Sequence, residues 1–193
     1  MIKNLILSIV VILNMGISNN IFSATYSLIK SESFLKTRAT YLVLFSLNAE
    51  FNAFDGTIIW DDSNLEESSF SGYAKIEDLS TGYSQIDAQL HSNLFFDKDR
   101  YPTMKIESHA ITFVEDNKYT VNADLTVKDI TLPISETLWV LPHPEDPEKR
   151  LFKASFYVNR QSFNLGENLS NMMINDKVLV SFLFAAKKIV SSK

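Results

Sequence analysis

The sequence has no cysteine, and it has only five glycines, five prolines and three histidines among 193 residues. The lack of cysteine excludes disulfide bonds, thiolate chemistry and a lipid-modified cysteine at a processed N-terminus. The few glycines form no Gly-x-Ser-x-Gly nucleophile elbow, no phosphate-binding loop and no dinucleotide-binding fingerprint. The protein therefore depends on packing for its stability, and its sequence offers none of these catalytic motifs.

Positive charge is also scarce, because 18 Lys and Arg stand against 23 Asp and Glu, a formal net charge of −5. No basic cluster interrupts this balance, which argues against nucleic acid as a partner. Hydrophobic residues make up 46% of the chain, far from the composition of a disordered protein. These values predict a globular domain with a sizeable core.

The N-terminus has the pattern of a secretory signal peptide. Lys3 precedes an apolar run over residues 5–13, and small residues follow up to Ala24. A membrane-spanning helix needs roughly 20 apolar residues, and this run stops at Asn14, so we expect no permanent membrane anchor. We predict a signal peptide over residues 1–24 and a single periplasmic domain over residues 25–193.

Beyond this segment, alternation of apolar and polar residues dominates. In residues 119–127, Tyr119, Val121, Ala123, Leu125 and Val127 share one face, as in a half-buried strand. Pro133 is expected at a strand start or edge. The predicted strands cover residues 40–47, 119–127, 131–141, 151–158 and 177–187, and the one helix predicted, capped by Ser84, covers residues 84–97.

Many short strands favour an antiparallel barrel or a sandwich. Residues 40–47 and 178–185 are apolar on both faces. A barrel with an apolar lumen needs such strands where a helix, a loop or a second subunit covers its outside. The pattern therefore favours a barrel with an internal cavity over a solid sandwich.

Several motifs resemble one known family. Residues 91–108, HSNLFFDKDRYPTMKIES, carry a Phe-Phe-Asp followed by a Tyr-Pro. Residues 51–58 (FNAFDGTI), 123–134 (ADLTVKDITLPI) and 156–165 (FYVNRQSFNL) carry further motifs in the same order. Together they are similar to the YceI-like family of periplasmic polyisoprenoid-binding proteins, over essentially all of residues 25–193.

The resemblance implies a lipocalin-like up-and-down antiparallel β-barrel of about eight strands with one or two short helices. It implies a long isoprenoid, quinone-like or fatty amphiphile in the lumen, a homodimer, and neither catalysis nor a cofactor. Histidines that the family often carries are replaced here by Glu32, Tyr41 and Gln89, which makes a catalytic role less credible. A role in ligand binding does not require these histidines.

The candidate ligand-contacting side chains are apolar, and each of them alternatively fills a plain core. Lys128 and Arg160 are the candidates for holding a phosphate head group, and Trp60 and Trp139 are candidates for the rim or a dimer contact. The predicted ligand-contacting residues are Phe51, Phe54, Leu94, Phe95, Phe96, Val121, Leu125, Leu138, Phe156, Phe182 and Phe184.

Two rival hypotheses remain. An enzyme on the barrel scaffold would use His91 or Asp97 as a general base on a lipid-like substrate, with Asp87 and Asp99 nearby. The plainer interpretation of these residues is a solvated helix end and turn. Because the three histidines show no metal-ligand spacing, we expect no metal site. The last rival is a ligand-independent stress or interaction protein that acts through its surface.

Overall fold

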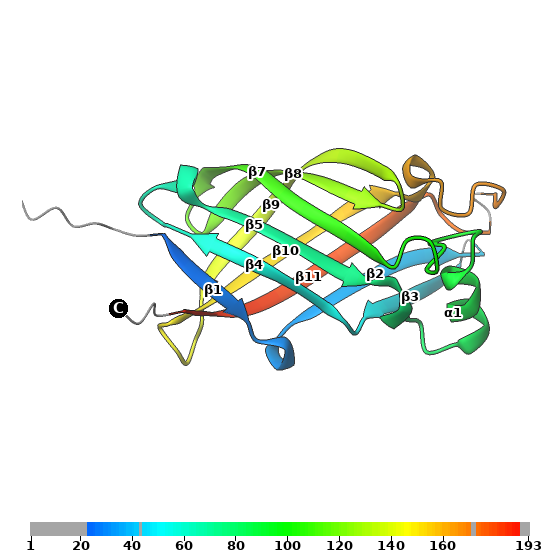
Figure 1. Cartoon of the computed structure of the whole chain (residues 1–193), viewed down its shortest axis with the longest axis horizontal. Helices are drawn as coiled ribbons and strands as arrows, with labels where there is room; N and C mark the ends of the chain where they lie inside the picture. The colour runs from blue at the N-terminus through cyan, green and yellow to red at the C-terminus, as the bar shows by residue number, and fades with distance from the viewer. Residues whose placement is uncertain (1–22, 43, 171–172, 190–193) are drawn as a thin grey trace, which may run out of the picture.

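Antiparallel strands form almost all of the protein in the computed structural model, which describes residues 23–42, 44–170 and 173–189 (Figure 1). The predicted signal peptide, residues 1–24, lies almost entirely outside the described residues and stays a prediction. The strands are β1 (Ala24–Leu28), β2 (Phe34–Tyr41), β3 (Phe45–Phe51), β4 (Phe54–Trp60), β5 (Ser69–Lys75), β6 (Leu79–Ser80), β7 (Thr103–Glu115), β8 (Lys118–Val127), β9 (Ile130–Pro142), β10 (Lys149–Asn159) and β11 (Lys177–Lys188). The helices are α1 (Ser84–His91) and the short 3-10 helices η1 (Lys30–Glu32), η2 (Leu65–Glu67), η3 (Ile76–Asp78) and η4 (Arg160–Phe163).

The sheet closes on itself. Its order is β1-β4-β5-β7-β8-β9-β10-β11, and β11 pairs back with β1 to complete a ring of eight strands. The strands β2, β3 and β6 continue the sheet beyond β11. All of these pairings are antiparallel, which confirms the predicted all-β, up-and-down barrel.

Strand β8 shows why the alternating pattern folds this way. Tyr119, Val121, Ala123, Leu125 and Val127 are all buried, while the residues between them are less buried or exposed. The strand pairs along its length with β7 on one side and β9 on the other. The predicted strand over residues 119–127 is confirmed, and its apolar face lines the barrel interior.

Strands β9 and β10 stay together over only part of their length. The register runs from Lys153 opposite Trp139 to Arg150 opposite Pro142 and does not extend toward Ile130. The first part of β9 is therefore an edge on that side. Pro133 lies in this part, where its missing N–H costs no ladder hydrogen bond to β10. The prediction of an edge position for Pro133 is confirmed.

Two local predictions are wrong. The apolar residues 40–47 do not form one strand, because β2 ends at Tyr41 and β3 begins at Phe45, with Leu42 in the left-handed region at φ 47°. No Gly, Pro or Asn marks this turn in the sequence. The predicted helix over residues 84–97 ends at His91, and Tyr83 rather than Ser84 precedes it without a side-chain cap. The chain then turns, with Asp97 at φ 51°.

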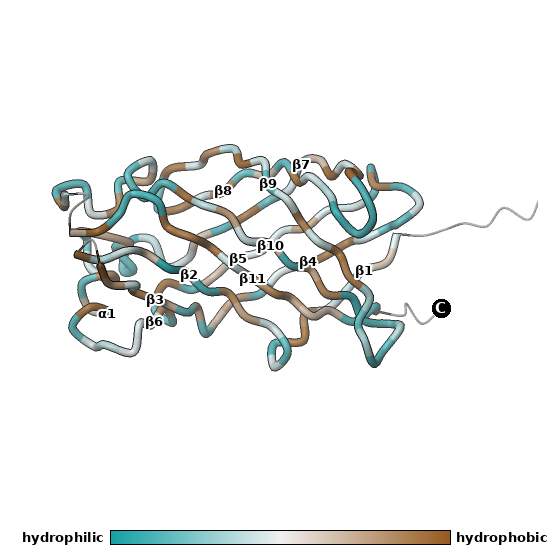
Figure 2. The backbone as a smooth tube through the Cα atoms, turned by 180° about the vertical axis from the view of Figure 1, so that it is seen from behind, coloured by the Kyte–Doolittle hydropathy of each residue, from teal (hydrophilic) through white to brown (hydrophobic). Residues whose placement is uncertain are grey.

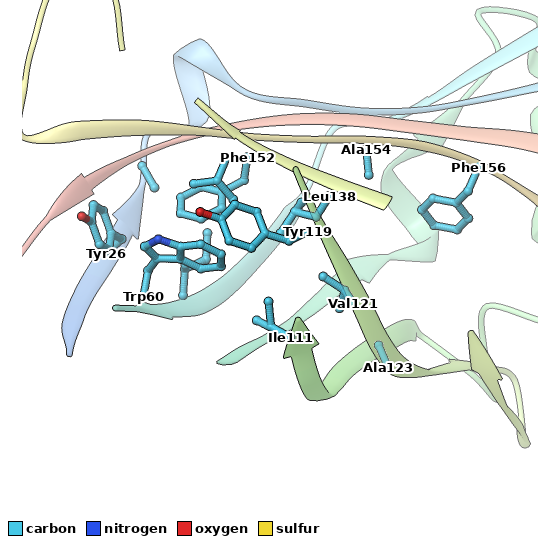
Figure 3. Packing of buried hydrophobic residues seen from close by; sticks show 13 residues of the cluster. Tyr26, Trp60, Ile111, Tyr119, Val121, Ala123, Leu138, Phe152, Ala154 and Phe156 are labelled. Atoms are coloured by element: carbon cyan, nitrogen blue, oxygen red, sulfur yellow. The ribbon is translucent and has the colours of Figure 1, made fainter. Parts of the chain in front are cut away.

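Aromatic side chains fill the end of the barrel away from α1 (Figure 3). Trp60 packs edge-on against Tyr119 at 4.8 Å between ring centroids and against Phe152 at 5.8 Å. Its indole N–H donates to Asp62 at 2.7 Å. Trp60 is 3% exposed, so of its two expected roles, rim or dimer contact, it has almost no surface for the dimer contact. The packed aromatics close this end and leave space further along the barrel.

Candidate functional site

A first apolar cavity of about 110 Å³ lies in the middle of the barrel. Three of its aromatic residues are in ring contact: Phe182 stacks on Phe184 at 4.5 Å, and Phe54 meets Phe184 at 5.2 Å. Paired Gly56 and Gly72, one on β4 and one on β5, also line it and place no side chain in the space. The cavity is therefore bounded by flat rings on one side and bare backbone on another.

A second apolar cavity of about 110 Å³ lies toward the end that carries α1. Phe51 on β3 and Phe96 in the turn after α1 line it, and both belong to the apolar packing around β3 and β6. Phe95, Phe163 and Ile174 cover it from outside the ring of strands. Loops rather than strands thus close this end of the barrel.

The two cavities adjoin. Met104, Leu125 and Val180 line both of them, so these three side chains separate one space from the other. Ligand pockets are usually about 300–1,000 Å³, which is more than either cavity offers alone. A long chain therefore needs these side chains to turn aside and merge the spaces. Met104 suits this role because an unbranched thioether adapts its shape easily.

Most of the predicted ligand-contacting residues line these cavities. Val121 is buried in the neighbouring core and lines neither cavity. Leu94 points away: it is 55% exposed, and its carbonyl accepts a hydrogen bond from the Gly166 N–H at 2.8 Å. Its placement in the lumen is wrong, because the turn after α1 directs only the two phenylalanines inward. The residues brought together are Phe51, Phe54, Phe95, Phe96, Leu125, Leu138, Phe156, Phe182 and Phe184.

Arg160 lines the second cavity, and most of its donors are used within the chain. Its guanidinium is 2% exposed, and both of its Nη atoms donate to main-chain carbonyls of its own chain. An ion pair with Asp176 at 2.9 Å balances its charge. The accepting carbonyls belong to Leu165, Gly166, Leu169 and Ile174, at 2.7, 2.8, 3.0 and 3.1 Å.

Arg160 therefore orders main-chain groups of Leu165–Leu169 and of Ile174 beside the second cavity, a structural role that the sequence reasoning missed. Lys128, the other head-group candidate, lies in the turn between β8 and β9 at φ 57°. Its Nζ lies 3.5 Å from the Asn164 carbonyl, outside both cavities.

His91 and Asp87, both on α1, connect this helix to β6 through hydrogen bonds. The Nε2 of His91 lies 3.0 Å from the carbonyl oxygen of Leu79. Partial burial raises the pKa of Asp87, but hydrogen bonds from the Thr81 N–H and hydroxyl and from the Ser80 hydroxyl outweigh it, so the pKa is lowered. Neither His91 nor Asp87 lines an apolar cavity. These two residues therefore take no part in the apolar cavities, and the general-base hypothesis gains no support from them.

A third hollow, of about 630 Å³, has a partly charged lining and shares Thr37 and Ala49 with the second cavity. Its wall includes Lys36 and Glu50, paired at 3.4 Å, and Arg38, whose Nε donates to the Asn48 amide oxygen at 2.9 Å. This wall therefore carries charged side chains, unlike most of the lining of the two smaller cavities. We therefore place the candidate site in the two smaller apolar cavities, despite the greater volume of this hollow.

A closed antiparallel barrel with an apolar interior defines the lipocalin-like class of barrels. Within it, the chain belongs to the YceI-like family, because the model of the YceI-like domain matches residues 26–186. A UPF0312 protein of Photorhabdus laumondii is 28% identical over 152 residues, 77% of this chain and 79% of the relative. A UPF0312 protein of Pseudomonas putida is 26% identical over 136 residues, 69% and 71% of the two chains.

Solved structures share the fold. BcnA of Burkholderia cenocepacia superposes with a TM-score of 0.77 at 20% identity, over 83% of this chain and 99% of that one. A polyisoprenoid binding domain from Saccharophagus degradans, implicated in plant cell wall breakdown, gives a TM-score of 0.69 at 17% identity, over 85% and 98%. At these identities the likeness establishes the architecture alone.

Proposed function

We propose that this protein is a periplasmic carrier that binds a long-chain isoprenoid or similar amphiphile in the barrel lumen. One observation carries the proposal: two apolar cavities adjoin inside the barrel and share Met104, Leu125 and Val180. The name of the Saccharophagus degradans domain supports an isoprenoid as the ligand class. The signal-like N-terminus supports the periplasm.

Apolar burial is sufficient for affinity in such a site. Each CH₂ group removed from water contributes up to ~0.8 kcal/mol, less the cost of immobilising the chain. A few isoprene units therefore bind well without a charged contact, and the length of the merged cavities selects among tails. The proposed carrier catalyses no reaction. We further propose that it forms a homodimer, as the family resemblance implies.

Ligand identification tests the proposal. The protein is exported in its native host, purified without detergent, extracted with organic solvent, and the extract is analysed by mass spectrometry. We expect a prenyl chain, a quinone or a related amphiphile in stoichiometric amount. An empty extract, together with no uptake of geranylgeraniol or a short-chain quinone on titration, would overturn the proposal.

A further inference from the structure

The turn between β2 and β3 exposes an unusual amount of apolar surface. Leu44 is 84% exposed and Phe45 is 62% exposed, and Tyr41 and Leu42 beside them are 36% and 46% exposed. Met173, 42% exposed, adjoins them, because its carbonyl accepts the Leu42 N–H at 2.9 Å. We call these five residues the apolar tip. No charged residue lies between Arg38 and Glu50 in the sequence.

The apolar tip belongs to the same hairpin that lines the second cavity. Ala39, two residues before Tyr41, and Leu47, two residues after Phe45, are both in the cavity wall. Ile174 lines the cavity as well and forms a β-bridge with Tyr41. In Figure 2 this apolar part of the chain lies at the end of the barrel that carries α1. The exposed apolar surface thus continues into the apolar interior.

We propose that the apolar tip docks on a lipid bilayer and brings the second cavity against the source of its ligand. The largest exposed apolar patch of a monomer, typically about 300–600 Å², is often functional. Aromatic and aliphatic side chains on a protruding turn suit the boundary between head groups and acyl chains. Arg38, which forms no ion pair within the described residues, lies on the adjoining strand and offers a positive charge to lipid phosphates.

The size of the tip favours a bilayer over a second copy of the chain. The five side chains expose on the order of 500 Å² together. A stable dimer needs about 800 Å² from each partner, so the tip alone is too small. A bilayer has no such requirement, because it surrounds a protruding side chain on all sides. The delivery of ligand rests on the proposed carrier function, whereas docking on the bilayer does not.

Sedimentation with sucrose-loaded vesicles of phosphatidylcholine and phosphatidylglycerol tests the proposal. We expect the wild-type protein to bind, and the double variant Leu44→Ser with Phe45→Ser to bind about tenfold or more weakly. The matched control is Phe113→Ser with Val114→Ser, which removes exposed apolar residues from the opposite end of the barrel. It should bind as the wild type does. Leu44→Ser alone provides a second variant, because so exposed a side chain contributes little to folding.

Wild-type protein that stays in the supernatant, or tip variants that bind as well as the wild type, would overturn the proposal. A dimer that the double variant converts to a monomer, without vesicle binding by either, would assign the tip to a second copy instead. Uptake of free farnesol in solution is measured in parallel and should be unchanged in the tip variant. Failure of the wild type to take up farnesol would count against the carrier function and leave the docking result standing.

Discussion

Arg160 and Asp176 form an ion pair of 2.9 Å at the end of the barrel that carries α1, with the arginine side chain 2% exposed. The same guanidinium holds four main-chain carbonyls between Leu165 and Ile174. Two of these residues, Leu165 and Ile174, line the second cavity. One buried cation thus orders main-chain groups at this end of the lumen.

Replacement of Arg160 by Met should destabilise the protein strongly. It removes the ion pair with Asp176 and the side-chain donor of four main-chain carbonyls, a loss of about 3–5 kcal/mol for a buried pair. Urea unfolding followed by circular dichroism measures the change. The control is Arg150→Met, which removes a more exposed ion pair with Asp62 and should cost at most about 1 kcal/mol. Equal losses in the two variants would contradict the structural role of Arg160.

Gly166 should tolerate no side chain. A Cβ there would lie 2.9 Å from the ring of Phe95, and the backbone φ of 62° disfavours an L-residue. Gly82 has a φ of 80° but open space around it. Gly166→Ala should therefore lower the free energy of unfolding by about 1–3 kcal/mol more than Gly82→Ala does. Similar values for the two would show that Phe95 does not pack where we place it.

Glu136 gives the stability a pH dependence. It shares the inward-facing alternation of β9 with Leu138, opposite Val121, and burial raises the pKa of its carboxyl. The unfolded chain ionises this group first as the pH rises, so ionisation disfavours folding above the ordinary glutamate pKa of about 4.3. The protein is therefore most stable with respect to this group at low pH, where Glu136 is protonated in both states. Its free energy of unfolding falls as the pH rises through the elevated pKa.

Glu136→Gln should therefore raise the melting temperature at neutral pH, by roughly 1–3 °C. Below the ordinary glutamate pKa both states of the wild type are protonated, and the difference should vanish. Thermal melts of the two proteins over a pH series measure this. A variant that is less stable than the wild type at neutral pH would mean that the ionised carboxylate has a stabilising partner.

Met104 should control the length of chain that enters the lumen. It lines both cavities, and replacement by the stiffer, β-branched Ile keeps its approximate volume. Geraniol, which has half the isoprene units of geranylgeraniol, should bind Met104→Ile as well as the wild type does. Geranylgeraniol should bind roughly fivefold more weakly, or by about 1 kcal/mol. An equal change for the two alcohols would show that the cavities are not joined at Met104.

Periodicity predicted the strands well where packing follows it. The five inward residues of β8 and the position of Pro133 needed only alternation and the missing N–H. The hairpin at residues 40–47 could not be found this way, because a turn without Gly, Pro or Asn looks like a continuous apolar strand. That error came from assuming that apolar residues are covered, whereas Leu44 is 84% exposed.

The sequence predicted the positions of the site residues less reliably than it predicted the fold. Phe95 and Phe96 line the second cavity as expected, but their neighbour Leu94 is turned outward by the backbone after α1. Arg160 illustrates the limit most clearly. Its sequence context is compatible with a surface charge or a head-group ligand, and only the folded segment around it supplies the carbonyls that bury it.

The most direct test of the central claim is a titration of delipidated protein with geranylgeraniol. The comparison is between Leu125→Trp, which fills the boundary of the two cavities, and Thr126→Trp, whose neighbouring site faces outward and pairs with the Thr131 hydroxyl at 2.9 Å. We expect tight, saturable binding by the wild type and by Thr126→Trp, and a loss of binding in a folded Leu125→Trp protein. Equal binding by all three proteins, or none by the wild type, would contradict a ligand in the lumen.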